Sequence, residues 1–149
     1  MANENNNRIL YPDIELKHRL PLQIRFGDYD TFGHINNNSY MAYLDLGKSE
    51  FLCYIMGKRS VPSEFAAAIV NINVDFLAPT TIGENIEVRT GVVRLGERSF
   101  TVYQRIVNPD TEVVKVQATT VLAGFDISTQ SSAPLQTSLT TALKKSLSL

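Results

Sequence analysis

The feature that most limits the fold is one long helical pattern followed by a series of strand patterns. From Tyr40 to Met56, apolar residues recur at spacings of three and four, which predicts a mostly buried amphipathic helix. A single helix of this kind needs another layer of structure to cover its apolar face.

That layer is predicted by alternating apolar and polar residues in the second half of the chain. In residues 67–77, Ala68, Val70, Ile72, Val74 and Phe76 are expected on one face of a strand. Short turns separate the later candidates, and the shorter stretch 20–26 alternates before the helix. The predicted strands are residues 20–26, 67–77, 85–95, 99–107 and 112–125. This order predicts an α+β domain in which one curved, five-stranded antiparallel sheet wraps around one long buried helix.

The residues that flank the helix support its boundaries. Residues 36–39, three asparagines and a serine, are candidate N-caps. Gly57 stands where a left-handed C-cap is favoured, and Lys58 and Arg59 follow beside the negative end of the dipole. Gly47 inside the helix costs about 1 kcal/mol relative to alanine. We therefore expect another element to approach the backbone closely there.

The length of 149 residues predicts a single domain. Residues 1–7 are polar and are predicted to be disordered, and residues 128–149 form a predicted C-terminal tail with a weak helix. An open antiparallel sheet leaves unpaired edges, and one helix covers only one face. We therefore expect at least a homodimer, in which a second subunit hides an edge.

Charge and cysteine content exclude several classes of protein. The formal net charge is -1, which gives no electrostatic case for a nucleic-acid or membrane partner. The one cysteine, Cys53, excludes an internal disulfide framework and a cysteine-built zinc site. No apolar run approaches the roughly 20 residues of a membrane helix, and no signal peptide is visible. These features predict a cytoplasmic protein.

Chemistry is concentrated in residues 25–40, RFGDYDTFGHINNNSY. The chain has no phosphate-binding glycine loop and no GxSxG elbow, and the spacing of Asp28, Asp30 and His34 matches no standard metal site. The first turn of a helix offers unpaired N–H groups that can hold a developing oxyanion. A carboxylate just before it could act as nucleophile or general base. The residues alone leave open whether they do this chemistry or only cap the helix and form turns.

The same stretch closely resembles the signature of hotdog-fold thioesterases of the 4-hydroxybenzoyl-CoA thioesterase-like family, which read roughly D-x-D-x-x-G-H-V-N-N-x-x-Y before a buried helix. The matching residues are Asp28, Asp30, Gly33, His34, Ile35, Asn36, Asn37 and Tyr40. The resemblance continues through a proline, a glycine and a hairpin, and covers about residues 20–125. It implies a hotdog fold, with a tetramer as a common assembly.

The resemblance also implies roles for individual residues. Asp30 would attack the thioester or activate water, and the backbone N–H of Asn37 would polarise the carbonyl. Gly33 would permit a tight approach at the helix mouth, and Tyr40 would pack or orient the loop. His34 matches a histidine that contributes to the site in related plant-type acyl-carrier-protein thioesterases.

The remaining predicted contacts are less specific. Gly33, Asn36 and Tyr40 are placed among the substrate-binding residues, and Asp28 is expected to be structural. Arg98 is a candidate for the coenzyme A phosphates, as are Arg94 and the pair Lys58–Arg59, since basic side chains suit phosphate.

The favoured reading is an acyl-CoA thioesterase that needs no cofactor beyond the coenzyme A of its substrate. An acyl-carrier-protein thioesterase of fatty-acid metabolism stays open, although Phe32 stands where the plant-type enzymes have asparagine. A non-catalytic acyl-CoA-binding module of the same fold is the third reading.

Overall fold

The computed structural model describes residues 8–57 and 66–148. Residues 1–7, predicted to be disordered, and the two basic residues after the helix, Lys58 and Arg59, lie outside the described residues. The elements are β1 His18–Pro21, a 3-10 turn at Phe26–Asp28, α1 Asn37–Met56, β2 Ala67–Phe76, β3 Glu87–Leu95, β4 Ser99–Val107, β5 Val114–Asp126, β6 Ser131–Ser132 and α2 Thr137–Lys145. No helix in these two ranges is long and apolar enough to cross a membrane.

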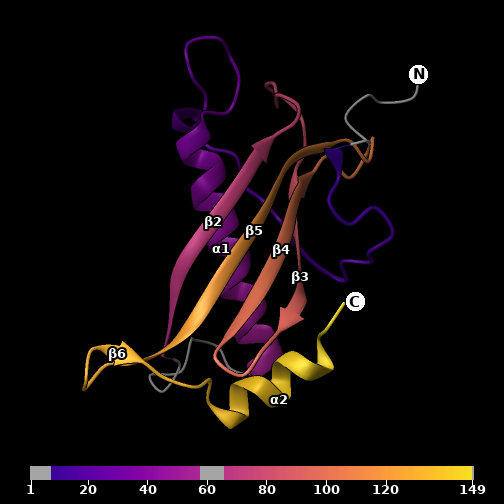
Figure 1. The fold of residues 1–149 in the computed structure, drawn as a ribbon. Coiled ribbons are helices and arrows are strands. Elements are labelled where there is room, and N and C mark those ends of the chain that lie inside the picture. Colours follow the sequence, from indigo (N-terminus) through magenta and orange to yellow (C-terminus); the bar gives the residue numbers. More distant parts are fainter. Residues whose placement is uncertain (1–7, 58–65, 149) are drawn as a thin grey trace.

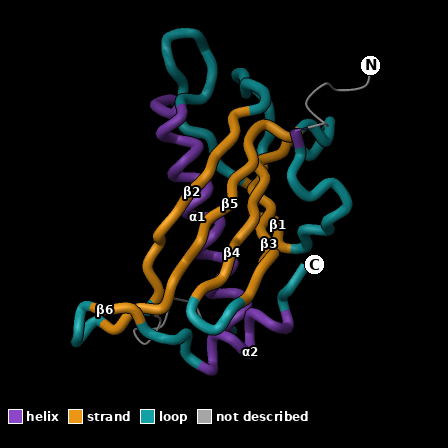
Figure 2. Tube along the Cα trace, in the orientation of Figure 1, coloured by secondary structure: helices purple, strands orange, loops and turns teal. Residues whose placement is uncertain are grey.

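The five main strands form one antiparallel sheet in the order β1-β3-β4-β5-β2, and β6 adds a short pairing to the end of β5. Helix α1 lies along one face of this sheet, and α2 packs near the C-terminal end of α1 (Figures 1 and 2). The prediction of an α+β hotdog fold is confirmed. The helix predicted within the C-terminal tail is present as α2.

Helix α1 begins and ends where its flanking residues predict. The side chain of the N-cap Asn36 accepts a hydrogen bond from the Ser39 N–H, and Gly57 ends the helix with a left-handed φ of 66°. The close approach expected at Gly47 is also present, because an added Cβ would collide with both methyl groups of Val88 on β3. Helix and sheet are therefore in backbone-to-side-chain contact at this point.

The strand predicted at residues 20–26 is wrong over most of its length. The ladder of β1 covers only His18–Pro21, paired with β3, and the chain then turns into the 3-10 helix. Leu22 and Ile24 still pack against the core, as their alternation predicts, but Phe26 is 97% exposed. Proline at position 21 and glycine at position 27 favour leaving the ladder, because neither supports a regular strand interior.

Strand β2 also departs from its predicted alternation. Its register with β5 shifts between Ile69 and Asn71, which marks a bulge. Ile69 lies opposite the buried Leu122 and so shares its face of the sheet, the face that strict alternation assigned to Val70, but at the sheet edge Ile69 is itself 44% exposed. Val70 is 62% exposed. A bulge inserts one extra residue, so every β2 side chain before it lies on the opposite face from the one that strict alternation predicts.

Candidate active site at the start of helix α1

Asp28 is a buried anchor of the loop before α1. It is 7% exposed and accepts hydrogen bonds from the Tyr43 hydroxyl at 2.5 Å, the Ser39 hydroxyl at 3.1 Å and the Arg25 N–H at 2.9 Å. Burial by itself would raise the pKa of the Asp28 carboxyl, but the hydrogen bond from Tyr43 and the others outweigh it and lower that pKa. This geometry agrees with the structural role predicted for Asp28.

Asp30 has a different environment, because its side chain is exposed at the turn that follows. One carboxylate oxygen accepts the N–H groups of Phe32 at 2.9 Å and His34 at 3.1 Å, and the Asp30 N–H donates to the His34 carbonyl at 2.7 Å. The second carboxylate oxygen has no hydrogen bond to any described residue. The turn therefore holds the carboxylate in place and leaves one oxygen free for a reacting group.

Gly33 is required by backbone conformation, since its φ is 75°. An added Cβ would have no described neighbour within 4 Å. The tight approach implied by the family resemblance is therefore not a contact between described residues, and the turn geometry explains the glycine. The imidazole of His34 is half-buried and makes no hydrogen bond with the described part of the chain.

The first turn of α1 presents free donors. Asn36 accepts the Ser39 N–H at 2.8 Å through its side chain, and its carbonyl accepts the Tyr40 N–H at 3.3 Å. The backbone N–H groups of Asn37 and Asn38 have no acceptor among the described residues. Two donors at the positive end of a helix dipole can stabilise negative charge.

A second segment, residues 79–81, supports this helix mouth. The Thr80 carbonyl accepts the Ile35 N–H at 3.1 Å, and the Thr80 hydroxyl oxygen accepts the Tyr40 hydroxyl at 2.8 Å. Thr81 forms a β-bridge with His34. Tyr40 is 3% exposed, in agreement with the packing role predicted for it. Sequence reasoning missed Thr80, because nothing local indicates which loop it contacts.

Arg98 lies far from this site. It is in the β3–β4 connection, where its guanidinium donates to the Ser132 hydroxyl at 3.1 Å. Residues 79–81 precede the Glu87 end of β3, whereas Arg98 follows the Leu95 end, and nine strand residues span roughly 30 Å. Arg98 thus lies apart from the loop and helix start that are supported by residues 79–81 and that hold the other predicted site residues: Asp30, Gly33, His34, Asn36, Asn37 and Tyr40.

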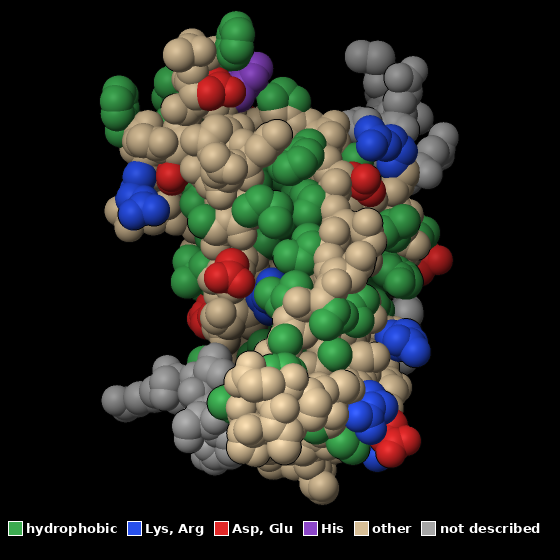
Figure 3. All heavy atoms as spheres, turned by 60° about the vertical axis from the view of Figure 1, so that its left-hand side comes forward, with side chains coloured by type: hydrophobic (Ala, Val, Ile, Leu, Met, Phe, Trp, Pro, Cys, Tyr) green, Lys and Arg blue, Asp and Glu red, His purple; other side chains and the backbone are tan. Residues whose placement is uncertain are grey.

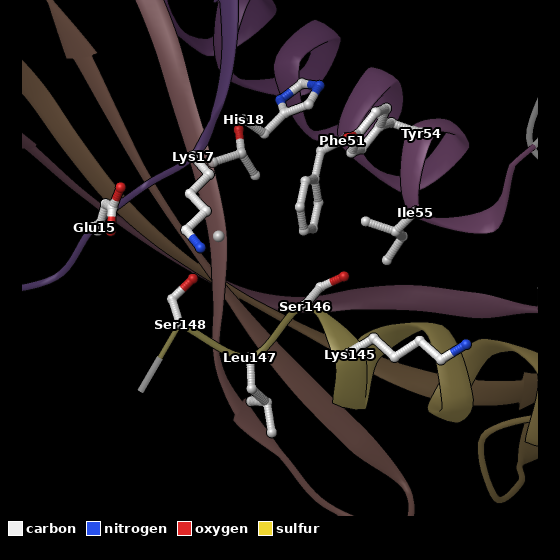
Figure 4. A pocket seen from close by; sticks show the side chains of 12 residues that line it. Glu15, Lys17, His18, Phe51, Tyr54, Ile55, Lys145, Ser146, Leu147 and Ser148 are labelled. Atoms are coloured by element: carbon white, nitrogen blue, oxygen red, sulfur yellow. The ribbon is translucent and has the colours of Figure 1, made fainter.

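Among the cavities lined by described residues, two flank α1. One, of about 490 Å³, opens beside its first turns and is lined in part by Arg25, Asn36 and Asn38. The other, of about 370 Å³, lies near its C-terminal half (Figure 4), between the aromatic rings of Phe51 and Tyr54 and residues 145–148. Only the first adjoins the predicted site. No cluster of side chains in the described residues could hold a metal ion.

Residues 24–143 match the family model of the thioesterase-like superfamily, so the chain belongs to this family. The acyl-CoA thioester hydrolase YbgC of Escherichia coli is 24% identical over 98 residues, which are 64% of this chain and 73% of that relative. Membership of a thioesterase family confirms the prediction of a thioester hydrolase.

Solved structures show the same fold. A predicted thioesterase from Bacillus stearothermophilus has a TM-score of 0.76 at 23% identity, over 87% of this chain and 95% of that one. A thioesterase from Thermus thermophilus, complexed with coenzyme A and Zn, has a TM-score of 0.75 at 22% identity, over 87% and 99% of the two chains.

Proposed function

We propose that this chain is an acyl-CoA thioesterase in which Asp30 supplies the reactive carboxylate and the Asn37 N–H polarises the thioester carbonyl. The observation that carries this proposal is an exposed, turn-held carboxylate in the loop that leads directly into α1, whose first N–H donors have no acceptor among the described residues. The relative YbgC, named as an acyl-CoA thioester hydrolase, supports the choice of substrate.

The reaction needs two events that these groups can provide. As a general base, Asp30 takes a proton from water while the water oxygen bonds to the carbonyl carbon. The carbonyl oxygen becomes an oxyanion, which the helix N–H groups stabilise. When the intermediate collapses, the C–S bond breaks, and the leaving sulfur takes up a proton to give free coenzyme A and the acid. Attack by Asp30 itself would form a mixed anhydride that water then hydrolyses.

A second subunit is part of this proposal. Strand β2 lies at one edge of the sheet, and several of its apolar side chains are exposed: Ile69, Val70, Ile72 and Phe76. Figure 3, in which the β2 side of the molecule is turned forward, shows hydrophobic side chains gathered along the middle of that side. We propose that a partner subunit covers this edge in a homodimer or homotetramer, and that the acyl group lies in the apolar slot between α1 and the partner.

Other parts of the proposal follow from the same chemistry. Hydrolysis by a carboxylate requires no metal or redox cofactor, and coenzyme A enters only as part of the substrate. A role for Arg98 toward the phosphates would require that the substrate reach it from a second subunit, given its distance from Asp30 within one chain. A cytoplasmic location and a place in fatty-acid metabolism stay predictions.

The test is thiol release from a panel of acyl-CoA substrates by the wild type and by Asp30→Asn. Asparagine keeps the side-chain oxygen that accepts the Phe32 and His34 N–H groups, so the turn should survive while the carboxylate is lost. We expect kcat to fall by about two to four orders of magnitude. Equal turnover by both enzymes would refute the role of Asp30.

A matched control is available in Asp126, which also holds a turn through one carboxylate oxygen, at 2.9 Å from the Ser128 N–H. Asp126→Asn should leave kcat unchanged. Faster turnover of carrier-linked than CoA-linked substrates would favour the acyl-carrier-protein alternative. Tight acyl-CoA binding without any hydrolysis would favour the non-catalytic module.

A further inference from the structure

An ion pair lies directly behind the segment that supports the helix mouth. The Lys115 ammonium, on β5, donates to one Glu84 oxygen at 2.7 Å and to the Pro79 carbonyl at 2.9 Å. The other Glu84 oxygen accepts the Thr81 N–H at 2.7 Å and the Thr81 hydroxyl at 3.2 Å. Residues 79–81 are thus held at both ends by one pair of opposite charges.

The same three residues hold the candidate active site on their other side. Thr80 accepts both the Ile35 N–H and the Tyr40 hydroxyl, and Thr81 bridges to His34. The three residues that Thr80 and Thr81 contact, His34, Ile35 and Tyr40, are close in sequence to Asp30 and Asn37. Lys115 and Glu84 therefore hold residues 79 and 81, and Thr80 between them accepts the hydrogen bonds from the helix mouth, so one short segment connects the ion pair to the candidate site.

Burial and charge indicate that this pair is ordered. Lys115 is 6% exposed and Thr80 is fully buried. Burial by itself would raise the pKa of Glu84, but hydrogen bonds from Lys115, the Thr81 N–H and the Asn108 side-chain amide lower it to about 2. Glu84 is therefore ionised across the neutral range.

We propose that Glu84 is a positioning residue: by clamping residues 79–81 against Lys115, it sets where the segment that carries Asp30 and Asn37 meets the substrate. The predicted effect of Glu84 on turnover rests on the proposed thioesterase function. The predicted effect of Glu84 on the order of residues 28–40 does not, because the hydrogen bonds are internal to the chain. Catalytic groups displaced by about 1 Å can lose on the order of a hundredfold in rate.

A second ion-pair cluster provides the control. Arg89 donates to both oxygens of Glu112, at 2.7 and 3.0 Å, and to Glu87 at 2.8 Å. Arg89 is itself buried, at 9% exposure. No hydrogen bond or ion pair among the described residues joins the side chains of this cluster to residues 28–40 or 79–84, and the bond from the Glu112 backbone N–H to the Asn108 carbonyl is kept in Glu112→Gln. Loss of the Glu112 charge should therefore lower stability without moving the helix mouth.

The experiment compares Glu84→Gln with Glu112→Gln. We expect Glu84→Gln to lower kcat for acyl-CoA hydrolysis at least about tenfold while KM changes less than about threefold, because the loss is one of geometry at the reacting groups. Amide hydrogen exchange, read by mass spectrometry on peptides covering residues 28–40, should accelerate at least about tenfold. Glu112→Gln should change neither quantity by more than about twofold.

The two readouts separate the possible failures. If Glu84→Gln lowers the melting temperature but matches Glu112→Gln in kcat and in exchange, Glu84 is only structural and the proposal is wrong. If the wild type hydrolyses no acyl-CoA, the proposed function fails, and the exchange data alone decide whether the clamp exists.

A second variant guards against misfolding of the first. Glu84→Gln leaves the Lys115 ammonium buried without its charge partner, which is costly. The double substitution Glu84→Gln with Lys115→Gln removes both charges and should fold better. Wild-type kcat and wild-type exchange in this variant would overturn the proposal, whereas the same losses as in Glu84→Gln would support it.

Discussion

Gly47→Ala tests how helix α1 is seated on the sheet. The added Cβ would collide with both methyl groups of Val88, at 2.8 Å from one of them. Val88 is fully buried and its branched side chain has few rotamers in a strand, so it cannot simply turn away. The helix or the strand must shift.

Two opposing effects set how much Gly47→Ala changes the free energy of unfolding. Alanine should stabilise an isolated helix by about 1 kcal/mol relative to glycine. Overpacking a filled core costs roughly 1–3 kcal/mol. The sum is a destabilisation of about 0–2 kcal/mol, with overpacking the larger effect, which corresponds to a melting temperature lower by up to about 8 °C in a chain of this size.

The assay is thermal and urea unfolding of the wild type, Gly47→Ala, Val88→Ala and the double variant. Removing the Val88 methyl groups should relieve the collision, so the double variant should be more stable than the sum of the single effects by about 0.5–3 kcal/mol. Ser49→Ala, at an exposed position of the same helix, should cause no loss. Stabilisation by Gly47→Ala alone would refute the collision.

Three further predictions concern the loop and its supports. Tyr43→Phe removes a hydrogen bond to the buried Asp28 carboxylate and should lower the free energy of unfolding in urea by about 1–3 kcal/mol. An unchanged urea midpoint would show that this hydrogen bond does not stabilise the fold. Asn36→Ala removes the cap of α1 and should cost about 1 kcal/mol, whereas Asn36→Asp should not, because aspartate also caps. The pKa of Glu84 is lowered from an ordinary value of 4.5 to about 2. Its ion pair therefore stabilises the fold above pH 4.5, and this contribution is lost as the pH falls from 4.5 to about 2. Melting temperatures measured from pH 7 downward should therefore fall more steeply in the wild type than in Glu84→Gln, and parallel curves would show that the pair contributes nothing.

Local patterns in the sequence predicted the elements and the place of the site. The spacing of apolar residues predicted α1, and the polar residues before it predicted its cap, because both depend on neighbours within one or two turns. The motif around Asp30 and Asn37 pointed to the helix mouth for the same reason. The structure has a turn-held carboxylate and, among the described residues, helix N–H donors without an acceptor in this stretch, and their catalytic roles stay predictions.

What the local pattern could not predict depends on partners distant in sequence. The alternation around Phe26 resembles a strand, yet the chain leaves the ladder with β3 after Pro21. Strict alternation placed Val70 on the same face of the sheet as Leu122, but the register with β5 puts Ile69 on that face. The proline and the glycine at positions 21 and 27 favoured the first outcome, whereas pairing with β5 decided the second, because one strand's own sequence does not contain its register.

For this protein, the sequence by itself indicated the long helix, most of the strands, the family and the stretch that is proposed to carry the chemistry. Only the tertiary structure decided that Asp28 is buried while Asp30 is exposed, that Thr80 supports the helix mouth, and that Arg98 lies at the far end of β3. The physical reason is that backbone propensity and capping act over a few residues. Burial and hydrogen-bond partners, in contrast, are set by which distant segments the sheet brings together.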